Sequence, residues 1–343
     1  MAAPRKKKLR FALVGSETLR GREIKSVLSF KKFPLQSFEL YDPDVEEEFS
    51  KLTRFRDEPK VVHHLEPKSL AGLDLVFLAS DAKTNAACGR RAAELDYRAL
   101  DLAETFNADK DVPLVVAGVN DAVLRGKNVP LVANPNPVTI ILAHLFHAFH
   151  PAFEIAKARA FVLEPVSVFE EAGIQELADQ SFALLSGATV PKKVFREQVA
   201  FNLLSRTEKP GPDGFSTRES RVLAEVRRVL APAEFPLSLA SVLAPVFHTC
   251  SAMVHVELGR KATIADLEAC FRQSDVIKVG PAEGSGLVSA TNVAGKEKIF
   301  VGQIKKADAA AGGGFWIWAV ADNLTLGSAL NAYEIARSLF DIS

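Results

Sequence analysis

Apolar runs separated by turns and amphipathic stretches fill the first third of the chain. Such runs predict strands at 9–14, 37–41, 73–79 and 98–102, and amphipathic stretches predict helices at 22–30 and 84–95. Strands that alternate with helices are typical of a parallel sheet. The pattern therefore predicts an α/β domain of the dinucleotide-binding kind.

The pattern changes after a further predicted strand at 129–133. A helix-like run begins at Ile140, and longer β-rich runs follow at 158–163 and 252–258. These runs predict a second domain that mixes helices and strands. The segment 208–214 contains two prolines and two glycines, which predicts an exposed loop.

Composition narrows the classes of function. The 343 residues are 48% hydrophobic, and 42 basic residues balance 42 acidic ones, so no net positive field favours nucleic acid or an anionic membrane as partner. The basic run Arg5–Lys8 is interpreted as a solvated tail. Cys88, Cys250 and Cys270 have neither metal-ligand nor disulfide-framework spacing. We expect a cytoplasmic protein without a membrane span and without a metal site.

One segment carries a family resemblance. Asn134-Pro135-Asn136-Pro137-Val138-Thr139 lies between a predicted strand and a predicted helix. It resembles the Asn-Pro-Asn-Cys-Ser-Thr turn of aspartate-semialdehyde dehydrogenases, whose cysteine attacks the aldehyde carbon. Pro137 stands at the position of that cysteine. A proline has no thiol, hydroxyl or amine, so the covalent route has no nucleophile here. Pro137 suits the first position of a helix, where no backbone donor is needed.

Other segments extend the resemblance over nearly the whole chain. The matching segments are Asp111–Asn120, Gly173–Gln180, Val301–Ile304, Trp318–Leu324 and Gly327–Ala332. They imply a Rossmann-type dinucleotide-binding domain plus a mixed α+β dimerisation domain. We expect the first domain at 1–133, completed by a C-terminal helix at 323–343, and the second at 134–322.

The positions that carry chemistry in the family differ here. By the resemblance, Cys250 stands where the family has its acid/base histidine, and Leu243, seven residues earlier, stands where an arginine binds the substrate carboxylate. Glu164 replaces the glutamine that orients the intermediate. Asn107 replaces an arginine that binds phosphate. With Pro137, these five changes predict that semialdehyde dehydrogenase activity is absent.

A glycine-containing turn bears on whether the chain binds a dinucleotide and which one. Gly15, Thr18 and Gly21 occupy the family's Gly-x-x-Gly-x-x-Gly phosphate turn, with Thr18 at the middle glycine. Thr18 adds bulk, although its hydroxyl suits a helix cap. Asp42 lies about 20 residues after Gly21, the spacing at which a carboxylate binds the ribose of NAD and repels the 2′-phosphate of NADP. If a dinucleotide binds, we therefore expect NAD rather than NADP.

Each of these residues also has a purely structural interpretation. Asp42 precedes Pro43 and suits a turn, and Glu17 adds negative charge inside the phosphate turn. Asn323 and Gly327 match the family's nicotinamide-side segment, yet both are also explained as residues at a helix start.

A replacement site remains open as an alternative. His248 and Cys250 are two residues apart, so in an extended chain they would share one face and could form a nucleophilic pair. Glu164, Glu170 and Glu171 could join His248 in a metal or carboxylate site, although their spacing matches no established ligand pattern. The simpler interpretation is a buried structural cysteine and solvated glutamates.

Two classes of function follow. The first is a catalytically silent homologue of the dehydrogenase, similar to bacterial family members that lack the active-site cysteine, acting as a ligand-binding or regulatory homodimer. The second is an NAD(P)-dependent oxidoreductase with a rebuilt site. Pairing with a paralogous dehydrogenase subunit is a narrower version of the first class.

Overall fold

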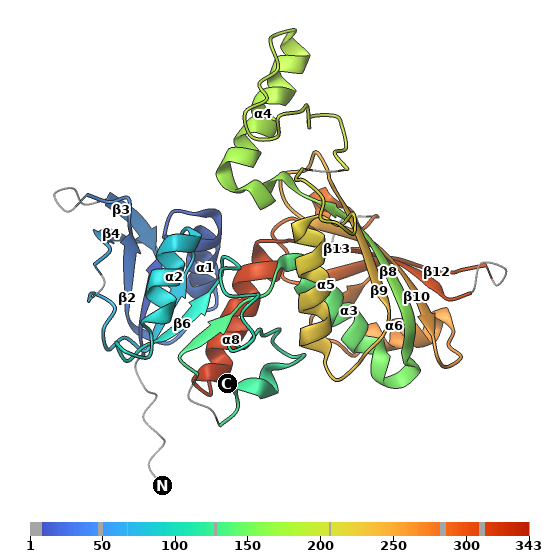
Figure 1. Cartoon of the computed structure of the whole chain (residues 1–343), viewed down its shortest axis with the longest axis horizontal. Coiled ribbons are helices and arrows are strands. Elements are labelled where there is room, and N and C mark those ends of the chain that lie inside the picture. Colours follow the sequence, from blue (N-terminus) through green and yellow to red (C-terminus); the bar gives the residue numbers. More distant parts are fainter. Residues whose placement is uncertain are drawn as a thin grey trace. The chain divides into compact units, whose positions relative to one another are not determined.

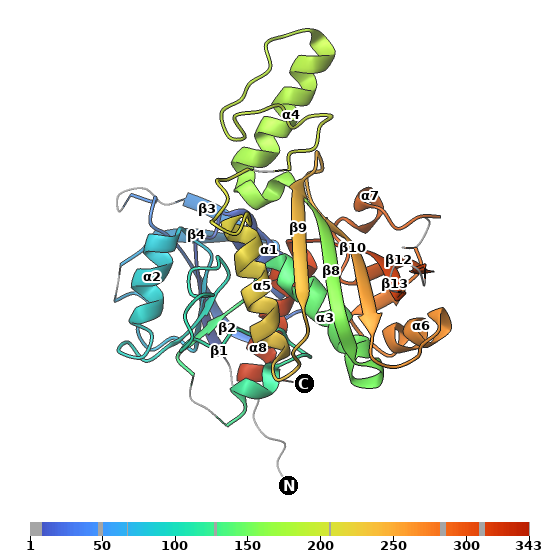
Figure 2. The same ribbon diagram turned by 45° about the vertical axis from the view of Figure 1, so that its right-hand side comes forward.

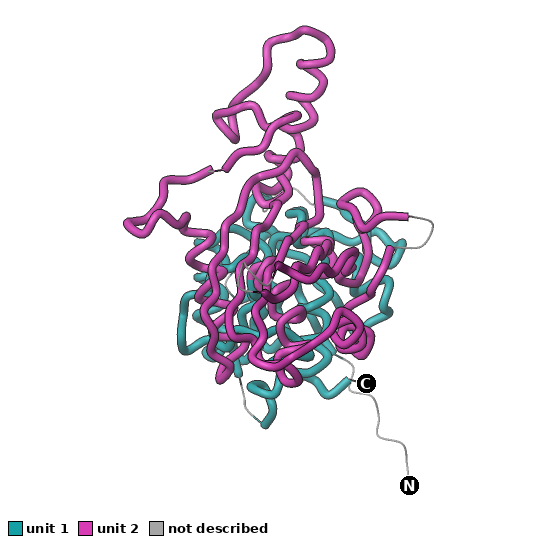
Figure 3. Tube along the Cα trace, turned by 90° about the vertical axis from the view of Figure 1, so that its right-hand side faces the viewer, with its two compact units in different colours: residues 1–135, 328–343 teal, residues 136–327 magenta. Residues whose placement is uncertain are grey.

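The computed structural model of the chain describes residues 9–46, 51–66, 68–126, 129–205, 207–281, 286–308 and 313–342. The chain divides into two compact units, shown in two colours in Figure 3. Unit 1 comprises residues 1–135 and 328–343, and unit 2 comprises residues 136–327. No helix in the described ranges is long and apolar enough to cross a lipid bilayer.

Unit 1 is built on a seven-stranded sheet in the order β3-β4-β2-β1-β5-β6-β7. Its strands are β1 (Leu9–Val14), β2 (Leu35–Asp42), β3 (Lys51–Phe55), β4 (Glu58–His64), β5 (Leu75–Leu78), β6 (Arg98–Asp101) and β7 (Leu131–Ala133). Its helices are α1 (Leu19–Phe30), α2 (Ala82–Arg90) and α8 (Asn331–Leu339), with a short 3₁₀ helix at Asp121–Leu124. All strand pairs are parallel except β3–β4. The prediction of a Rossmann-type α/β unit is confirmed.

The first helix begins earlier than the periodicity predicted. The Thr18 hydroxyl accepts a hydrogen bond from the Gly21 N–H and caps α1, so the helix starts at Leu19 instead of Arg22. In the same way Asp81 caps α2, which runs from Ala82 to Arg90 and ends five residues before the predicted Leu95. Capping side chains satisfy backbone donors that apolar periodicity does not reveal.

Aromatic rings fill the core of unit 1 along β1. Phe11 is fully buried, and its ring centroid lies 5.1 Å from that of Phe33, 5.8 Å from that of Phe77 and 5.5 Å from that of Phe340. Such clusters contribute more than their buried area alone. The last of these rings follows α8, so the C-terminal segment completes the core of unit 1.

Unit 2 is built on a six-stranded sheet in the order β11-β12-β13-β10-β8-β9. Its strands are β8 (Ile155–Glu164), β9 (Leu237–Leu243), β10 (Cys250–Leu258), β11 (Ile277–Val279), β12 (Ile299–Lys306) and β13 (Phe315–Ala321). Its helices are α3 (Pro137–Phe153), α4 (Glu170–Ser186), α5 (Thr217–Leu230), α6 (Ile264–Arg272) and α7 (Ala290–Val293), with a 3₁₀ helix at Val166–Phe169 and a π-helix at Thr325–Leu330. The sheet mixes parallel and antiparallel pairs. The prediction of a second domain that mixes helices and strands is confirmed.

Helices α3, α5 and α6 pack against this sheet, as the ribbons of Figures 1 and 2 show. Alternate strand residues therefore point to the other face, where Phe161, Met253 and Trp318 lie opposite one another across β8, β10 and β13. The Phe161 side chain is 44% exposed, and the neighbouring Trp316 is 40% exposed. This face of the sheet presents a row of large apolar side chains to its surroundings.

Helix α4 extends beyond the sheet of unit 2 in both ribbon views. Two buried side chains on it organise the segment that follows. The Glu176 carboxylate accepts hydrogen bonds from the N–H groups of Lys193, Val194 and Phe195 at 2.7, 2.6 and 3.0 Å. Gln180 accepts two more from Val199 and Ala200. Segment 208–214 beyond it is an irregular stretch exposed over most of its length, as predicted.

Candidate functional site

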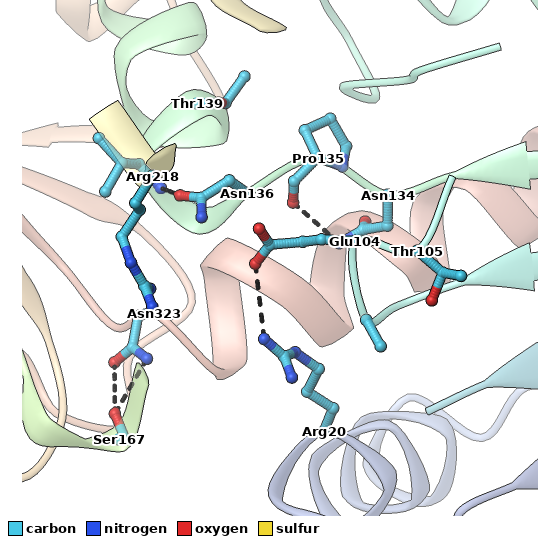
Figure 4. A network of polar contacts seen from close by, with 12 residues as sticks. Arg20, Glu104, Thr105, Asn134, Pro135, Asn136, Thr139, Ser167, Arg218 and Asn323 are labelled. Carbon is cyan, nitrogen blue, oxygen red and sulfur yellow. Dashed lines mark hydrogen bonds and ion pairs between the residues drawn. The ribbon is translucent and has the colours of Figure 1, made fainter. Parts of the chain in front are cut away.

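The start of α3 holds the position at which the family resemblance expects a nucleophile. Pro137 is the first helical residue, and the side chain of Asn136 accepts a hydrogen bond from the Val138 N–H at 2.9 Å. The prediction that Pro137 suits this position is confirmed, because the first residue of a helix needs no backbone donor. Figure 4 shows Asn136 and Thr139 at this helix start. The pyrrolidine ring supplies no reactive atom.

A carboxylate from α5 fixes this turn. Glu225 is 2% exposed, and its Oε2 accepts hydrogen bonds from the Asn136 N–H at 2.9 Å and from the Thr139 hydroxyl at 2.7 Å. A buried donor that lacks a hydrogen-bond partner costs about 1–3 kcal/mol, so these two hydrogen bonds stabilise the turn. The turn is therefore held firmly, even though it carries no nucleophile.

Two other candidate positions are neighbours in the sheet. Glu164 at the end of β8 and Leu243 at the end of β9 are register partners. Glu164 is 5% exposed, and its Oε2 lies 3.4 Å from Nη1 of Arg218, whose guanidinium lies 5.9 Å from the ring centroid of Phe169. Leu243 is buried in an apolar cluster with Val166 and other core residues. The site thus has an arginine, but it comes from α5 and pairs with a glutamate of the chain.

Cys250 and His248 do not form the extended pair that the spacing suggested. Strand β10 starts only at Cys250, and Thr249 between the two has φ +82°, so the chain is not extended there and that assumption was wrong. Cys250 is 2% exposed, and burial, followed by the charges of Glu164 and Asp322, raises the pKa of its thiol well above the ordinary value. Because the thiolate is the nucleophile, Cys250 behaves as a structural residue.

Asn323 organises the chain around this strand start. Its Oδ1 accepts a hydrogen bond from the Thr249 N–H at 2.9 Å, and its Nδ2 donates to the Ser167 hydroxyl at 3.1 Å. Asn323 lies in the turn just before the π-helix Thr325–Leu330, and it is Asp322 that caps this helix start, accepting hydrogen bonds from the Leu324 and Thr325 N–H groups, each at 2.8 Å. Figure 4 shows Asn323 directed at Ser167.

Glu170 and Glu171 lie in the first turn of α4. Carboxylates at this end of a helix are favoured by the helix dipole. In the parts of the chain that the structure describes, no group of three His, Cys, Asp or Glu side chains is arranged to hold a metal ion.

In unit 1 the glycine turn is closed by the chain's own groups. Gly15 has φ +84°, and a Cβ on it would lie 2.5 Å from the Ser80 nitrogen; a Cβ on Gly21 would lie 2.1 Å from the Gly15 oxygen. The Thr18 hydroxyl, besides capping α1, lies 3.0 Å from the carbonyl oxygens of Gly15 and Ala79. Close backbone packing therefore accounts for both glycines, and the Thr18 hydroxyl is already hydrogen-bonded.

Asp42 is the last residue of β2, and Asn107 lies in the segment that follows β6, six residues after Asp101. The Asp42 carboxylate accepts a hydrogen bond from the Asp44 N–H at 3.2 Å, which is the predicted turn geometry. Burial, with added repulsion from Asp44 and Glu17, raises the pKa of Asp42. Asn107 is 3% exposed. In the same segment Glu104 pairs with Arg20 of α1 at 3.5 Å, as Figure 4 shows.

Three residues of the site were missed at the level of sequence: Glu225, Arg218 and Asp322. Glu225 had a usable signal, because it lies on the buried stripe of α5 with Val222, Val226 and Val229. An acidic residue in an apolar stripe indicates a buried partner. Arg218 and Asp322 had no comparable signal.

In comparisons with known proteins, both units match domains of semialdehyde dehydrogenases. Residues 10–127 match the family domain described as "Semialdehyde dehydrogenase, NAD binding domain", and residues 150–326 match "Semialdehyde dehydrogenase, dimerisation domain". The aspartate-semialdehyde dehydrogenase of Shewanella violacea is 30% identical over 72% of this chain and 73% of its own length. That of Rickettsia conorii is 25% identical over 98% of both chains. The crystal structure of aspartate semialdehyde dehydrogenase II from Vibrio cholerae, complexed with ASA, superposes with a TM-score of 0.90 at 25% identity over 98% of this chain and 99% of that chain.

Proposed function

The chain belongs to the aspartate-semialdehyde dehydrogenase family, and from that premise we propose that it is a catalytically silent member that acts by binding a ligand or a protein partner. The observation that carries the proposal is Pro137 at the first position of α3, where the resemblance expects the cysteine nucleophile. Without a nucleophile no covalent acyl-enzyme forms.

The surrounding groups support the same conclusion. Cys250, at the position of the base, is buried and held as a neutral thiol. Leu243, at the position of the substrate arginine, has an apolar side chain that cannot bind a carboxylate. Glu164, at the position of the family's glutamine, has no amide to orient an intermediate and is paired with Arg218. Catalytic groups act as a unit, so the loss of several removes the reaction as fully as the loss of one.

The dinucleotide preference is part of the proposal. Any dinucleotide that binds unit 1 would be NAD rather than NADP, because Asp42 at the end of β2 suits a ribose diol and repels a 2′-phosphate. Asn107, in place of the family's phosphate-binding arginine, removes a positive charge from the inorganic phosphate site.

We also propose a homodimer formed through unit 2. The match of residues 150–326 to a dimerisation domain supports it. So does the row of Phe161, Met253 and Trp318, because an apolar sheet face of this kind is typical of an interface between subunits. A heterodimer with a paralogous active subunit would use the same surface.

The test is a direct assay. Purified protein is incubated with aspartate semialdehyde, inorganic phosphate and either NADP or NAD, and reduced cofactor is followed at its absorbance maximum. We expect no production above a no-enzyme control, with an active family member as positive control. Phosphate-dependent production of NADPH or NADH would overturn the proposal and establish the alternative, an oxidoreductase with a rebuilt site.

That alternative has one observation in its favour. Among the described residues, Nδ1 of His248 is buried and has no hydrogen-bond partner. An imidazole nitrogen without a partner inside the protein is a candidate general base. Replacing His248 with glutamine would therefore abolish any activity that the assay detected.

A further inference from the structure

Unit 2 contains a surface pocket where the end of α5 meets the start of β9. Figure 2 shows these two elements side by side, and residues 231–236 connect them. The volume of the pocket is about 510 Å³. Pockets of several hundred cubic ångströms are typical of small-molecule sites. The lining comes from the last turns of α5 and from this connection: Val226, Arg227, Leu230, Ala231, Ala233, Glu234, Phe235, Pro236 and Leu237.

This pocket lies beside the C-terminal half of α3, far along that helix from Pro137. The ring centroid of Phe235 is 5.4 Å from that of Phe146 and 5.6 Å from that of His150. Phe146 and His150 follow Pro137 by nine and thirteen residues on α3, which corresponds to about 14–20 Å along a helix. A ligand in this pocket therefore occupies a site separate from the candidate functional site, whether or not the chain is catalytically silent.

Much of the lining is apolar. Val226 is 1% exposed and Leu237 is 7% exposed, whereas Leu230 and Phe235 are only half-buried. The half-buried side chains leave apolar surface in contact with water inside the pocket. Covering such surface is favourable, because apolar groups leave water. The pocket therefore favours a ligand with an apolar side chain.

Two opposite charges line the same pocket. Arg227 on α5 and Glu234 in the connection are both exposed. Among the residues that the structure describes, neither side chain forms a hydrogen bond or an ion pair. A guanidinium binds a carboxylate through paired hydrogen bonds, and a carboxylate such as that of Glu234 binds an ammonium group. The lining thus offers one free cation and one free anion.

The end of α5 adds to the attraction for a positive group. The last carbonyl groups of a helix have no intrahelical partner and carry partial negative charge. The Leu230 carbonyl oxygen accepts a hydrogen bond from the Ala233 N–H at 2.9 Å. Ala231 has left the helical conformation, with φ −53° and ψ 138°, and Pro232 has no N–H to donate. The helix end therefore favours an ammonium group in the pocket, as Glu234 does.

From these observations we propose that the pocket binds a free amino acid with an apolar side chain. The Arg227 guanidinium binds the carboxylate of the amino acid. Glu234 and the end of α5 bind its ammonium group. The apolar side chain covers Leu230 and Phe235. A zwitterion matches both free charges at once, whereas a ligand with a single charge leaves one of them without a partner.

The first test is calorimetric titration of the full chain with leucine and phenylalanine. Isocaproate and hydrocinnamate are the matched compounds without the ammonium group, isoamylamine and phenethylamine are those without the carboxylate, and glycine has no side chain. We expect at least one of the two amino acids to bind at least tenfold more tightly than its own two analogues and than glycine. Absence of binding by both amino acids, or equal binding of an analogue or of glycine, overturns the inference.

Two charge variants test the assigned contacts. Arg227→Gln should weaken amino-acid binding at least tenfold and remove the advantage of the amino acid over the amine that lacks its carboxylate. Glu234→Gln should weaken it as strongly and remove the advantage over the acid that lacks the ammonium group. The control Lys261→Gln, exposed and outside the lining, should leave every affinity unchanged. Unchanged amino-acid binding in either pocket variant overturns the contact assigned to that residue.

A third pair of variants places the binding in the pocket. Ala231 is exposed and lines the pocket, so Ala231→Phe fills it without entering the core. Ala224→Phe is the matched control, because Ala224 is exposed on α5 and lies outside the lining. We expect Ala231→Phe to lose amino-acid binding and Ala224→Phe to retain it, with melting temperatures close to that of the unmodified chain. Equal amino-acid affinity in the two variants overturns the inference.

Discussion

The ring of Pro137 packs directly against Gly327. A Cβ placed on Gly327 would lie 2.7 Å from Cβ and 3.2 Å from Cα of Pro137. Gly327 belongs to the π-helix Thr325–Leu330, and Pro137 begins α3. The two segments can approach this closely only because one of them has no side chain.

This contact predicts that Gly327→Ala destabilises the protein. Forcing a methyl group into a closed contact costs about 1–3 kcal/mol, and a lowered melting temperature in scanning calorimetry would show it. The control is Gly286→Ala, because a Cβ on Gly286 would meet no atom within 4 Å. Equal melting temperatures for the two variants would show that the Pro137 contact gives way at no cost.

Pro137→Cys is expected to create a reactive thiol without creating a dehydrogenase. A thiol at a helix N-terminus has a lowered pKa, whereas the pKa values of Cys88, Cys250 and Cys270 are raised, by burial first in each case. Under native conditions the variant should show one thiol that reacts much faster with Ellman's reagent than any thiol of the unmodified chain.

The same variant, assayed with aspartate semialdehyde, phosphate and NADP, should still produce no NADPH, because the positions of the base and the substrate arginine hold Cys250 and Leu243. Pro137→Ser controls for the loss of the ring. NADPH production by the cysteine variant alone would mean that the remaining site is intact.

The sequence predicts some elements well for physical reasons that can be named. Strand β1 lies at Leu9–Val14 as predicted, because a buried parallel strand reads as a continuous apolar run. Strands β3 and β4 were not predicted, because Lys51–Phe55 and Glu58–His64 form an edge hairpin whose side chains are mostly exposed and polar. Strands with so little buried surface lack the alternation of apolar and polar residues from which a strand is predicted.

The sequence likewise predicts some relationships within the candidate site and not others. The resemblance assigned Glu164 and Leu243 to one site although 79 residues separate them, and the structure makes them register partners. No pattern in the chain predicts that Glu225 reaches Asn136, since that contact depends on how α5 packs against α3. The positive φ of Thr249 was also unpredictable, because threonine gives no signal for a left-handed conformation.

Glu225→Leu is expected to loosen the start of α3. The substitution leaves the Asn136 N–H and the Thr139 hydroxyl without this acceptor, which costs about 1–3 kcal/mol for each donor in a buried environment. Chemical denaturation should show the loss as a lower midpoint. Glu225→Gln retains an oxygen acceptor and should therefore recover part of the lost stability. The surface variant Glu268→Ala should change the free energy of unfolding by less than about 0.5 kcal/mol. A leucine variant as stable as that surface control would contradict the role of Glu225.

The buried imidazole of His144 on α3 predicts an acid-sensitive stability. Burial, with a smaller contribution from His147, lowers the pKa of His144 from 6.5 to about 4. The unfolded chain then binds a proton below pH 6.5 that the folded chain binds only near pH 4. The stability associated with neutral His144 is fully present above pH 6.5 and falls as pH decreases toward 4, by up to about 3 kcal/mol.

Free energies of unfolding measured by denaturation between pH 7.5 and about 4 test this expectation. His144→Leu removes the titrating group and should flatten the pH dependence relative to the unmodified chain. The exposed control His63→Leu should retain the full decline. Parallel curves for the His144 variant and the unmodified chain would assign the acid sensitivity to other groups.

Phe161→Glu is expected to convert the dimer to a monomer. Phe161 is the β8 member of the apolar row on the unit 2 sheet and is 44% exposed, and a carboxylate buried there against a second subunit would lack a partner. Size-exclusion chromatography with light scattering should give a dimer mass for the unmodified chain and a monomer mass for the variant. The control Phe30→Glu replaces a phenylalanine that is 76% exposed on α1 of unit 1, and should remain dimeric. A dimeric Phe161→Glu variant would place the interface on another surface.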